Sequence, residues 1–130
     1  MAEYLERPDG RIAYDDSGGD GPLIVAAPGM GDLRGSYRHL APLLVDAGCR
    51  FVSMDLRGVG ESTVEWPDYS DAAIGTDMTA LVNHLGGGPA VLVGNSLTAA
   101  SAVIAATEAP ASVRSLVLMG PFARDVPAPA

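Results

Sequence analysis

Residues 91–100 read VLVGNSLTAA, and this stretch decides how the chain can fold. A short apolar run stops at Gly94-Asn95-Ser96, and small residues suited to a helix follow at once. A serine between a strand and a helix in this pattern is typical of a nucleophile elbow, a sharp turn that holds the hydroxyl clear of both elements. The alternative interpretation is a serine that only caps the amino end of the helix.

Apolar runs and helical stripes alternate along the rest of the chain. Residues 3–7 and 11–15 flank the turn signal Pro8-Asp9-Gly10 and are expected to form an antiparallel hairpin at a sheet edge. Further strands are expected over residues 23–27, 51–54, 90–93 and 116–119. Apolar residues three and four positions apart predict three helices, one with Tyr37, Leu40, Leu44 and Ala47, one with Ile74, Met78, Leu81, Val82 and Leu85, and one over residues 97–108. The last is apolar nearly all round and is therefore expected to be buried.

This order of elements predicts an α/β fold. The expected sheet is mostly parallel, has about six strands including the N-terminal antiparallel hairpin, and carries helices on both faces. We expect residues 1–124 to form one partial domain and residues 125–130 to form a tail. Sites in such sheets lie beyond the carboxyl ends of the strands. Three loops fall there, at residues 28–32, 55–62 and 94–96.

The three loops carry a family resemblance that runs from about residue 3 to residue 124. They read Pro28-Gly29-Met30-Gly31, then Asp55-Leu56-Arg57-Gly58-Val59-Gly60-Glu61-Ser62, then Gly94-Asn95-Ser96-Leu97-Thr98. In this order and spacing they resemble the N-terminal half of an α/β-hydrolase. In that family the loops usually read His-Gly-x-Gly, Asp-x-Arg-Gly-x-Gly-x-Ser and Gly-x-Ser-x-Gly.

The resemblance implies a role for several residues. Ser96 would be the nucleophile, and the backbone N–H groups of Met30 and Leu97 would form an oxyanion hole. Gly29 and Gly31 would let the backbone approach the substrate oxygen closely, and the alternative is that they are ordinary turn glycines.

The second loop is expected to support the site without taking part in the chemistry. Asp55 can accept hydrogen bonds from loop amides, and Arg57 can pair with a neighbouring carboxylate. Two positions depart from the family pattern. Pro28 replaces a histidine that positions the loop, and Thr98 replaces the last glycine of the elbow. The branched Cβ of Thr98 is expected to crowd the turn and loosen it.

The remainder of a catalytic triad is not evident. A serine hydroxyl needs a base that takes its proton and an acid that orients the base, and in this family both follow the serine. The only histidines, His39 and His84, precede Ser96. We expect surface roles for both. Asp125 follows the last strand, where some family members place their acid, and it is either that acid or a solvated loop residue.

Composition restricts the partners of the protein. The 130 residues include 48% hydrophobic and 18% charged residues, as in a globular domain. A net charge of −8 with scattered basic residues argues against nucleic acids and anionic membranes as partners, which leaves a small-molecule substrate. Cys49 cannot form an internal disulfide and is expected to be a buried thiol, consistent with a cytoplasmic location. No ligand spacing for a metal and no dinucleotide motif is present, so no cofactor is expected.

Three functions remain open. The first is a serine hydrolase that cleaves an ester, amide or related acyl bond. The second is a relative that performs cofactor-free haloperoxidation or C–C bond hydrolysis on the same scaffold. The third is a non-catalytic remnant or binding protein. In the family, further strands, a helical cap and the histidine follow the matched half, so the chain is expected to be truncated and incomplete by itself. Residues 115–119 would then form an apolar sheet edge that invites self-association.

Overall fold

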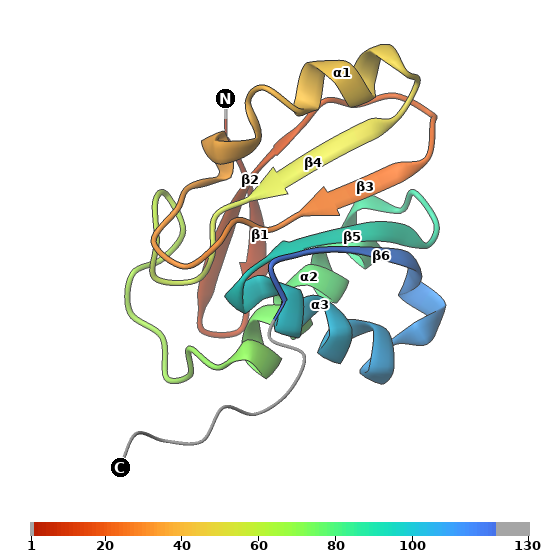
Figure 1. The fold of residues 1–130 in the computed structure, drawn as a ribbon. Coiled ribbons are helices and arrows are strands. Elements are labelled where there is room, and N and C mark those ends of the chain that lie inside the picture. Colours follow the sequence, from red (N-terminus) through yellow and green to blue (C-terminus); the bar gives the residue numbers. More distant parts are fainter. Residues whose placement is uncertain (1, 122–130) are drawn as a thin grey trace.

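A single sheet of six strands organises the protein, whose computed structural model describes residues 2–121. The strands are β1 (Glu3–Arg7), β2 (Gly10–Asp16), β3 (Leu23–Ala26), β4 (Arg50–Met54), β5 (Ala90–Asn95) and β6 (Val113–Met119). Their order across the sheet is β1-β2-β4-β3-β5-β6 (Figure 1). The hairpin of β1 and β2 joins β4 in antiparallel fashion, and β4, β3, β5 and β6 run parallel. The predicted fold class is confirmed.

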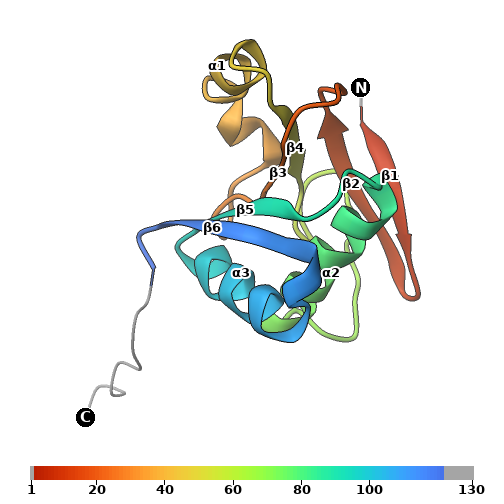
Figure 2. The same ribbon diagram turned by 90° about the vertical axis from the view of Figure 1, so that its right-hand side faces the viewer.

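Helices cover both faces of this sheet (Figure 2). The helix α2 (Asp71–Leu85) and the helix α3 (Leu97–Glu108) lie on one face, and α1 (Ala41–Asp46) lies on the other. A short 3₁₀ turn, η1 (Arg34–Tyr37), precedes α1, and a second one, η2 (Pro110–Ser112), leads into β6. The main core fills the space between the sheet and α2 and α3, because the inward side chains of the strands meet the apolar stripe of α2 there.

Local sequence signals explain where α2 begins and ends. The Ser70 hydroxyl accepts a hydrogen bond from the Ala73 amide and caps the amino end. Gly86 ends the helix with a φ of 71°, the left-handed conformation that favours glycine. The stripe of apolar residues predicted from their spacing faces the core, and the buried positions include Ile74, Met78 and Leu81.

The first helix is much shorter than its apolar spacing predicted. The chain forms η1, turns through residues 38–40 and begins α1 only at Ala41. Pro42 explains the break, because its ring removes an amide donor and would clash with the carbonyl of residue 38 in a continuous helix. Proline is tolerated in the first turn of a helix, so α1 starts just before it.

Two further expectations need correction. Only one face of α3 is buried, and Val103 on the other face is 43% exposed. The thiol of Cys49 is half-buried, where a buried one was predicted. In both cases the apolar sequence context overstated the burial, because an apolar residue among apolar neighbours in the sequence can still lie at the surface. Within residues 2–121, no helix is long and apolar enough to cross a membrane.

Candidate active site

The backbone of Ser96 is forced into an unusual conformation at the junction of β5 and α3. Its φ of 56° and ψ of −113° make it the only non-glycine residue with positive φ among those the structure describes. Such a conformation costs of order 1–3 kcal/mol and persists only where surrounding bonds enforce it. A serine that only capped the helix would accept an amide hydrogen bond with its side chain, and Ser96 makes no such capping bond.

Neighbouring backbone holds the turn in this strained shape. The Ser96 amide donates to the Met119 carbonyl of β6 at 2.8 Å, and the Ser96 carbonyl accepts from the Ala99 amide at 3.1 Å. Strand and helix also approach each other closely at Gly94, where an added Cβ would lie 2.4 Å from the Thr98 carbonyl oxygen. The elbow therefore depends on a residue without a side chain at position 94.

The loop after β3 lies beside the elbow, because a Cβ added at Gly29 would be 3.6 Å from the Asn95 carbonyl oxygen. The Asp32 amide donates to the Gly29 carbonyl at 3.0 Å and closes a four-residue turn. Gly31 occupies its third position with a φ of 84°, as a type II turn requires. The Met30 amide, at the second position, donates to none of the described backbone carbonyls. The Leu97 amide is equally unengaged, because the first amides of a helix have no intrahelical acceptor.

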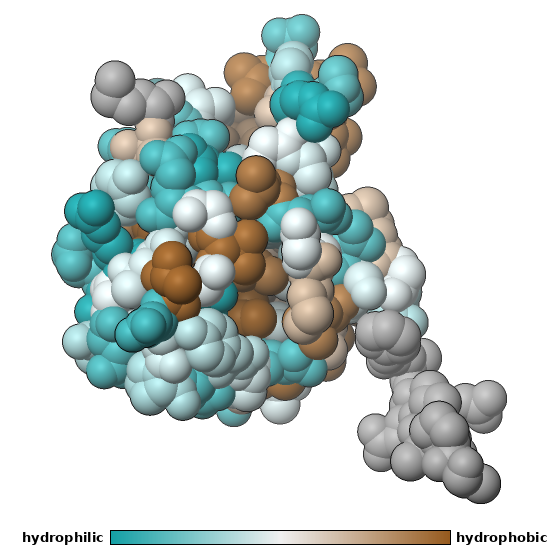
Figure 3. Space-filling model, turned by 90° about the vertical axis from the view of Figure 1, so that its left-hand side faces the viewer, coloured by the Kyte–Doolittle hydropathy of each residue, from teal (hydrophilic) through white to brown (hydrophobic). Residues whose placement is uncertain are grey.

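A small apolar pocket joins the three loops. It has a volume of about 180 Å³ and is lined by Met30, Leu56, Arg57, Gly58, Val59, Tyr69, Ile74 and Leu97. Apolar side chains gather across the centre of the face on which β3 and β4 end (Figure 3). Met30 and Leu97 therefore line one cavity although 67 positions separate them in the sequence. The expected convergence of the loops at one sheet edge is observed.

Asp55 lies buried at the end of β4 and organises the loops around it. Its carboxylate accepts the amides of Arg34 at 2.7 Å and Glu61 at 3.0 Å, and it forms an ion pair with the Arg34 guanidinium. Burial by itself lowers the pKa of Arg34, but hydrogen bonds to Glu61 and Asp55 outweigh it and raise that pKa. Gly60 must be a glycine, because an added Cβ would lie 2.4 Å from the Asp55 carboxylate.

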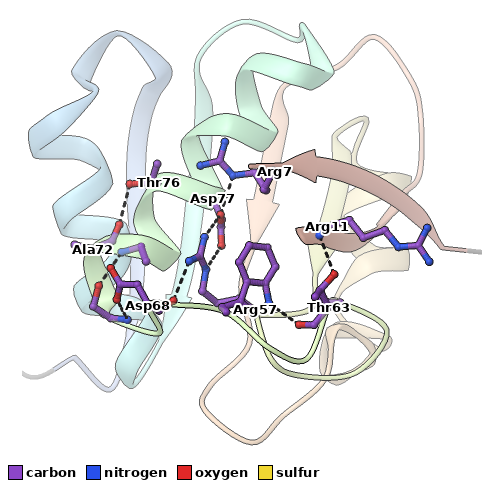
Figure 4. Close-up of polar contacts among 12 residues, drawn as sticks. Arg7, Arg11, Arg57, Thr63, Asp68, Ala72, Thr76 and Asp77 are labelled. Carbon is purple, nitrogen blue, oxygen red and sulfur yellow. Dashed lines mark hydrogen bonds and ion pairs between the residues drawn. The ribbon is translucent and has the colours of Figure 1, made fainter. Parts of the chain in front are cut away.

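Arg57 connects the long loop between β4 and α2 to helix α2 through hydrogen bonds. Its guanidinium makes two hydrogen bonds of 2.7 Å with the buried carboxylate of Asp77, to which Arg7 of β1 adds a third of 3.0 Å (Figure 4). The same guanidinium lies 4.2 Å from the ring centroid of Trp66. The hydrogen bond to Asp77 raises the pKa of Arg57. This cluster holds the wall of the small pocket in place.

The prediction that Thr98 crowds and loosens the elbow is wrong. The side chain is fully buried, and its hydroxyl accepts the Asn95 amide at 2.8 Å. The hydroxyl also lies 3.1 Å from the Asn95 carbonyl and 3.2 Å from the Ala27 carbonyl, toward which it can donate. The close approach of strand and helix falls at Gly94 instead, so position 98 has room for a side chain.

Tyr37 reaches the same strand end from η1. Its hydroxyl donates to the Ala27 carbonyl at 2.7 Å, and burial, followed by the negative charge of Asp32, raises the pKa of Tyr37 to about 12. We expect a spectrophotometric titration of the four tyrosines to show one phenol that ionises near pH 12. That step should vanish in Tyr37→Phe. Because the folded pKa lies above the ordinary value of 10.0, stability from this group should be complete below pH 10 and fall as the pH rises toward 12.

Among the described residues, no hydrogen bond joins a histidine to Ser96. His84 lies in the last turn of α2 and packs edge-on against Tyr14 of β2, with ring centroids 6.3 Å apart. His39 is exposed in the turn before α1. Asp125 lies outside the described residues. Within residues 2–121, no group of three or more His, Cys, Asp or Glu side chains could hold a metal ion.

The roles of several residues around the site were not predicted from the sequence. Arg34, Tyr37 and Tyr69 carry no motif, and their roles depend on contacts with distant segments. Asp77 had a usable signal, because it is a carboxylate beside the apolar stripe of a predicted helix, and a charge in that place needs a partner.

Comparison with known proteins agrees with this fold. Residues 22–130 match the family model described as alpha/beta hydrolase fold. The chain is 34% identical over 108 residues to BpoC of Mycobacterium tuberculosis, a protein named as a non-heme bromoperoxidase, and the match covers 83% of this chain and 41% of BpoC. It is 33% identical over 114 residues to the 2-hydroxy-6-oxo-6-phenylhexa-2,4-dienoate hydrolase of Comamonas testosteroni, covering 85% of this chain and 40% of that enzyme.

A solved structure is similar over almost the whole chain. The thermophilic esterase of Thermogutta terrifontis superposes with a TM-score of 0.86 at 28% identity, over 98% of this chain and 48% of the esterase. The chain belongs to the alpha/beta hydrolase fold family. It spans about two fifths of the length of the curated relatives described above.

Proposed function

We propose that this chain carries the nucleophile half of a serine hydrolase that acts on an ester or a related acyl bond of a small molecule. The observation that carries the proposal is the strained backbone of Ser96. The residues Met30 and Leu97 line one pocket beside this turn, and their amides donate to no described carbonyl. Strain at a half-buried turn with unused donors in the adjoining loops is typical of a catalytic site.

The proposed reaction begins when Ser96 Oγ attacks the substrate carbonyl carbon. The hydroxyl proton passes to a base, and the carbonyl oxygen becomes an oxyanion that accepts hydrogen bonds from the Met30 and Leu97 amides. The tetrahedral adduct collapses, the leaving alcohol takes a proton, and water later releases the acyl group from Ser96. The positive end of the α3 dipole stabilises the oxyanion further.

We propose that neither of the two histidines in this sequence is the base. Neither His39 nor His84 is hydrogen-bonded to Ser96 in the described residues, and the match covers only 41% of BpoC. We propose Asp125 as the acid that orients such a base. The chain by itself is then a poor catalyst whose serine is correctly placed but not activated.

Chemical rescue tests this proposal. Added imidazole should accelerate hydrolysis of a short aryl ester by the chain in proportion to its concentration, because it replaces the absent base. We expect a Ser96-dependent increase of at least about tenfold, below the 100-fold typical of a positioned base. Ser96→Ala should show only the solution reaction of imidazole, and Ser36→Ala, which removes an exposed serine in η1, should behave like the parent. Equal rates in the parent and Ser96→Ala would contradict the proposal.

A second function is favoured by the relatives themselves. BpoC is named for bromoperoxidation, and the Comamonas enzyme is named for hydrolysis of a dienoate. We therefore keep cofactor-free haloperoxidation or C–C bond hydrolysis as alternatives on the same residues. Bromination of a dye in the presence of peroxide and a carboxylic acid distinguishes the first of these from ester hydrolysis.

We also propose that the chain works in the cytoplasm, because its one cysteine can form no internal disulfide.

We further propose that the chain self-associates through β6. Within residues 2–121 this strand pairs only with β5, and it presents Val117, which is 48% exposed, at the sheet edge. Light scattering of the parent should therefore show dimers or larger species, and Val117→Lys should shift them toward the monomer. Val103→Lys, at a similarly exposed position on α3, should not. A parent that is a monodisperse monomer would contradict this.

A further inference from the structure

A single buried hydroxyl connects the elbow to the strand that carries the oxyanion loop. We propose that Thr98 is a positioning residue, which fixes the Met30 amide relative to Ser96 by bonding to both segments at once. The catalytic meaning of this link rests on the proposed oxyanion hole, whereas the link itself does not depend on any activity.

The bonding capacity of the hydroxyl matches its surroundings. A threonine hydroxyl has one hydrogen to donate and two lone pairs. One lone pair accepts the Asn95 amide at 2.8 Å. The one hydrogen has two carbonyl acceptors within reach, that of Asn95 at 3.1 Å and that of Ala27 at 3.2 Å, and donation to Ala27 makes the link between the two segments. Asn95 directly precedes the proposed nucleophile, so the hydroxyl joins that residue to β3 across the sheet edge.

Ala27 is the last anchored residue before the oxyanion loop. Its amide donates to the Val93 carbonyl of β5 at 2.9 Å, and its carbonyl accepts from Tyr37 at 2.7 Å as well as facing Thr98. The next residue, Pro28, has no amide hydrogen and cannot extend the ladder. The direction in which the chain leaves Ala27 therefore sets where residues 29–31 lie.

A glycine at position 98 could not make this link. It would leave the Asn95 amide without its partner and the Ala27 carbonyl with Tyr37 alone. The cavity left by the lost side chain would lie in a fully buried place. At position 98 this chain thus has a threonine where the family pattern has a glycine. The threonine adds a contact between the elbow and Ala27, which precedes the oxyanion loop.

Nuclear magnetic resonance of the full chain tests the link with a matched pair of variants. Thr98→Val keeps the shape and removes the hydroxyl, and Thr98→Ser keeps the hydroxyl. We expect Thr98→Val to speed hydrogen exchange of the Asn95 amide by about tenfold, as loss of one hydrogen bond allows. It should also shift the amide resonances of residues 29–31. Thr98→Ser should restore both, and Tyr37→Phe should move the resonances of 29–31 without speeding exchange at Asn95. If valine prevents folding, Thr98→Ala gives the same comparison with Thr98→Ser.

Two results would overturn the inference. In the first, Thr98→Val lowers stability but leaves the resonances of 29–31 unchanged, which is the signature of a purely structural side chain. In the second, Thr98→Ser fails to restore them. Imidazole-rescued hydrolysis distinguishes a failure of the Thr98 link from a failure of the proposed function. Loop resonances that respond while no Ser96-dependent hydrolysis is seen contradict the proposed function and support the link. Ser96-dependent hydrolysis that is present in the parent and equal in Thr98→Val and Thr98→Ser contradicts a positioning role.

Discussion

Replacing Gly94 with valine is expected to destabilise the protein by at least ~3 kcal/mol. A Cβ at this position would lie 2.4 Å from the Thr98 carbonyl oxygen, 2.6 Å from the Thr98 carbonyl carbon and 2.8 Å from the Ala99 Cα. These are backbone atoms of α3, so the clash cannot be relieved by a change of rotamer and the helix must move away from β5. Urea unfolding followed by far-ultraviolet circular dichroism measures the loss.

Two variants make the result specific. Gly94→Ala adds only the Cβ, and we expect it to lose less stability than valine does. Gly35→Ala serves as the control, because nothing lies within 4 Å of the added Cβ and the glycine is not in the left-handed region. It should remain within about 0.5 kcal/mol of the parent. A Gly94→Val protein as stable as Gly35→Ala would show that strand and helix are not in contact at the elbow.

Removal of the Asp77 carboxylate is the second large effect that we expect. Asp77→Ala should lower the free energy of unfolding by about 3–5 kcal/mol, because it leaves two largely buried guanidinium groups without this carboxylate. The side chain of Arg57 is 8% exposed and that of Arg7 is 19% exposed, while Asp77 is fully buried. Denaturant unfolding, followed by the fluorescence of Trp66, measures the change.

Trp66 is a convenient reporter because it is the only tryptophan and stacks on Arg57. In Asp77→Ala its native emission should shift to the red as the loop between β4 and α2 loosens. Asp77→Asn keeps the shape and one acceptor, so we expect an intermediate loss. Asp46→Ala, at an exposed position of α1, should leave both stability and emission unchanged. Equal stability of Asp77→Ala and Asp46→Ala would contradict a structural role for the cluster.

Much of the fold could be predicted from the sequence because its signals are local. The apolar runs mark the strands, and residues 97–108 form a helix with the predicted bounds. The first helix was predicted too long, because the spacing of Tyr37, Leu40 and Leu44 looks helical while Pro42 interrupts it. Spacing describes which side chains face the core but does not report a lost backbone hydrogen bond.

The site could be predicted only in part, since its hydrogen bonds and ion pairs connect residues that are far apart in the sequence. Arg34 bonds to Asp55, 21 positions later, and Arg57 bonds to Asp77, 20 positions later. Thr98 was misjudged for the same reason. Its partner Ala27 lies 71 positions away, so a motif could show only that a glycine was missing. A local pattern locates the serine, whereas the contacts that hold it come from the assembled sheet.

Reaction of the full chain with a fluorophosphonate, followed by peptide mapping, tests directly whether Ser96 is the nucleophile. An oxyanion hole without a base still gives an acceleration of about 10³-fold, so we expect one slow adduct per chain, located on Ser96. Ser96→Ala should carry none, and the exposed Ser36 and Ser70 should stay unmodified. Absence of an adduct on Ser96 in the folded chain, or adducts spread over exposed serines, would show that Ser96 is not the nucleophile.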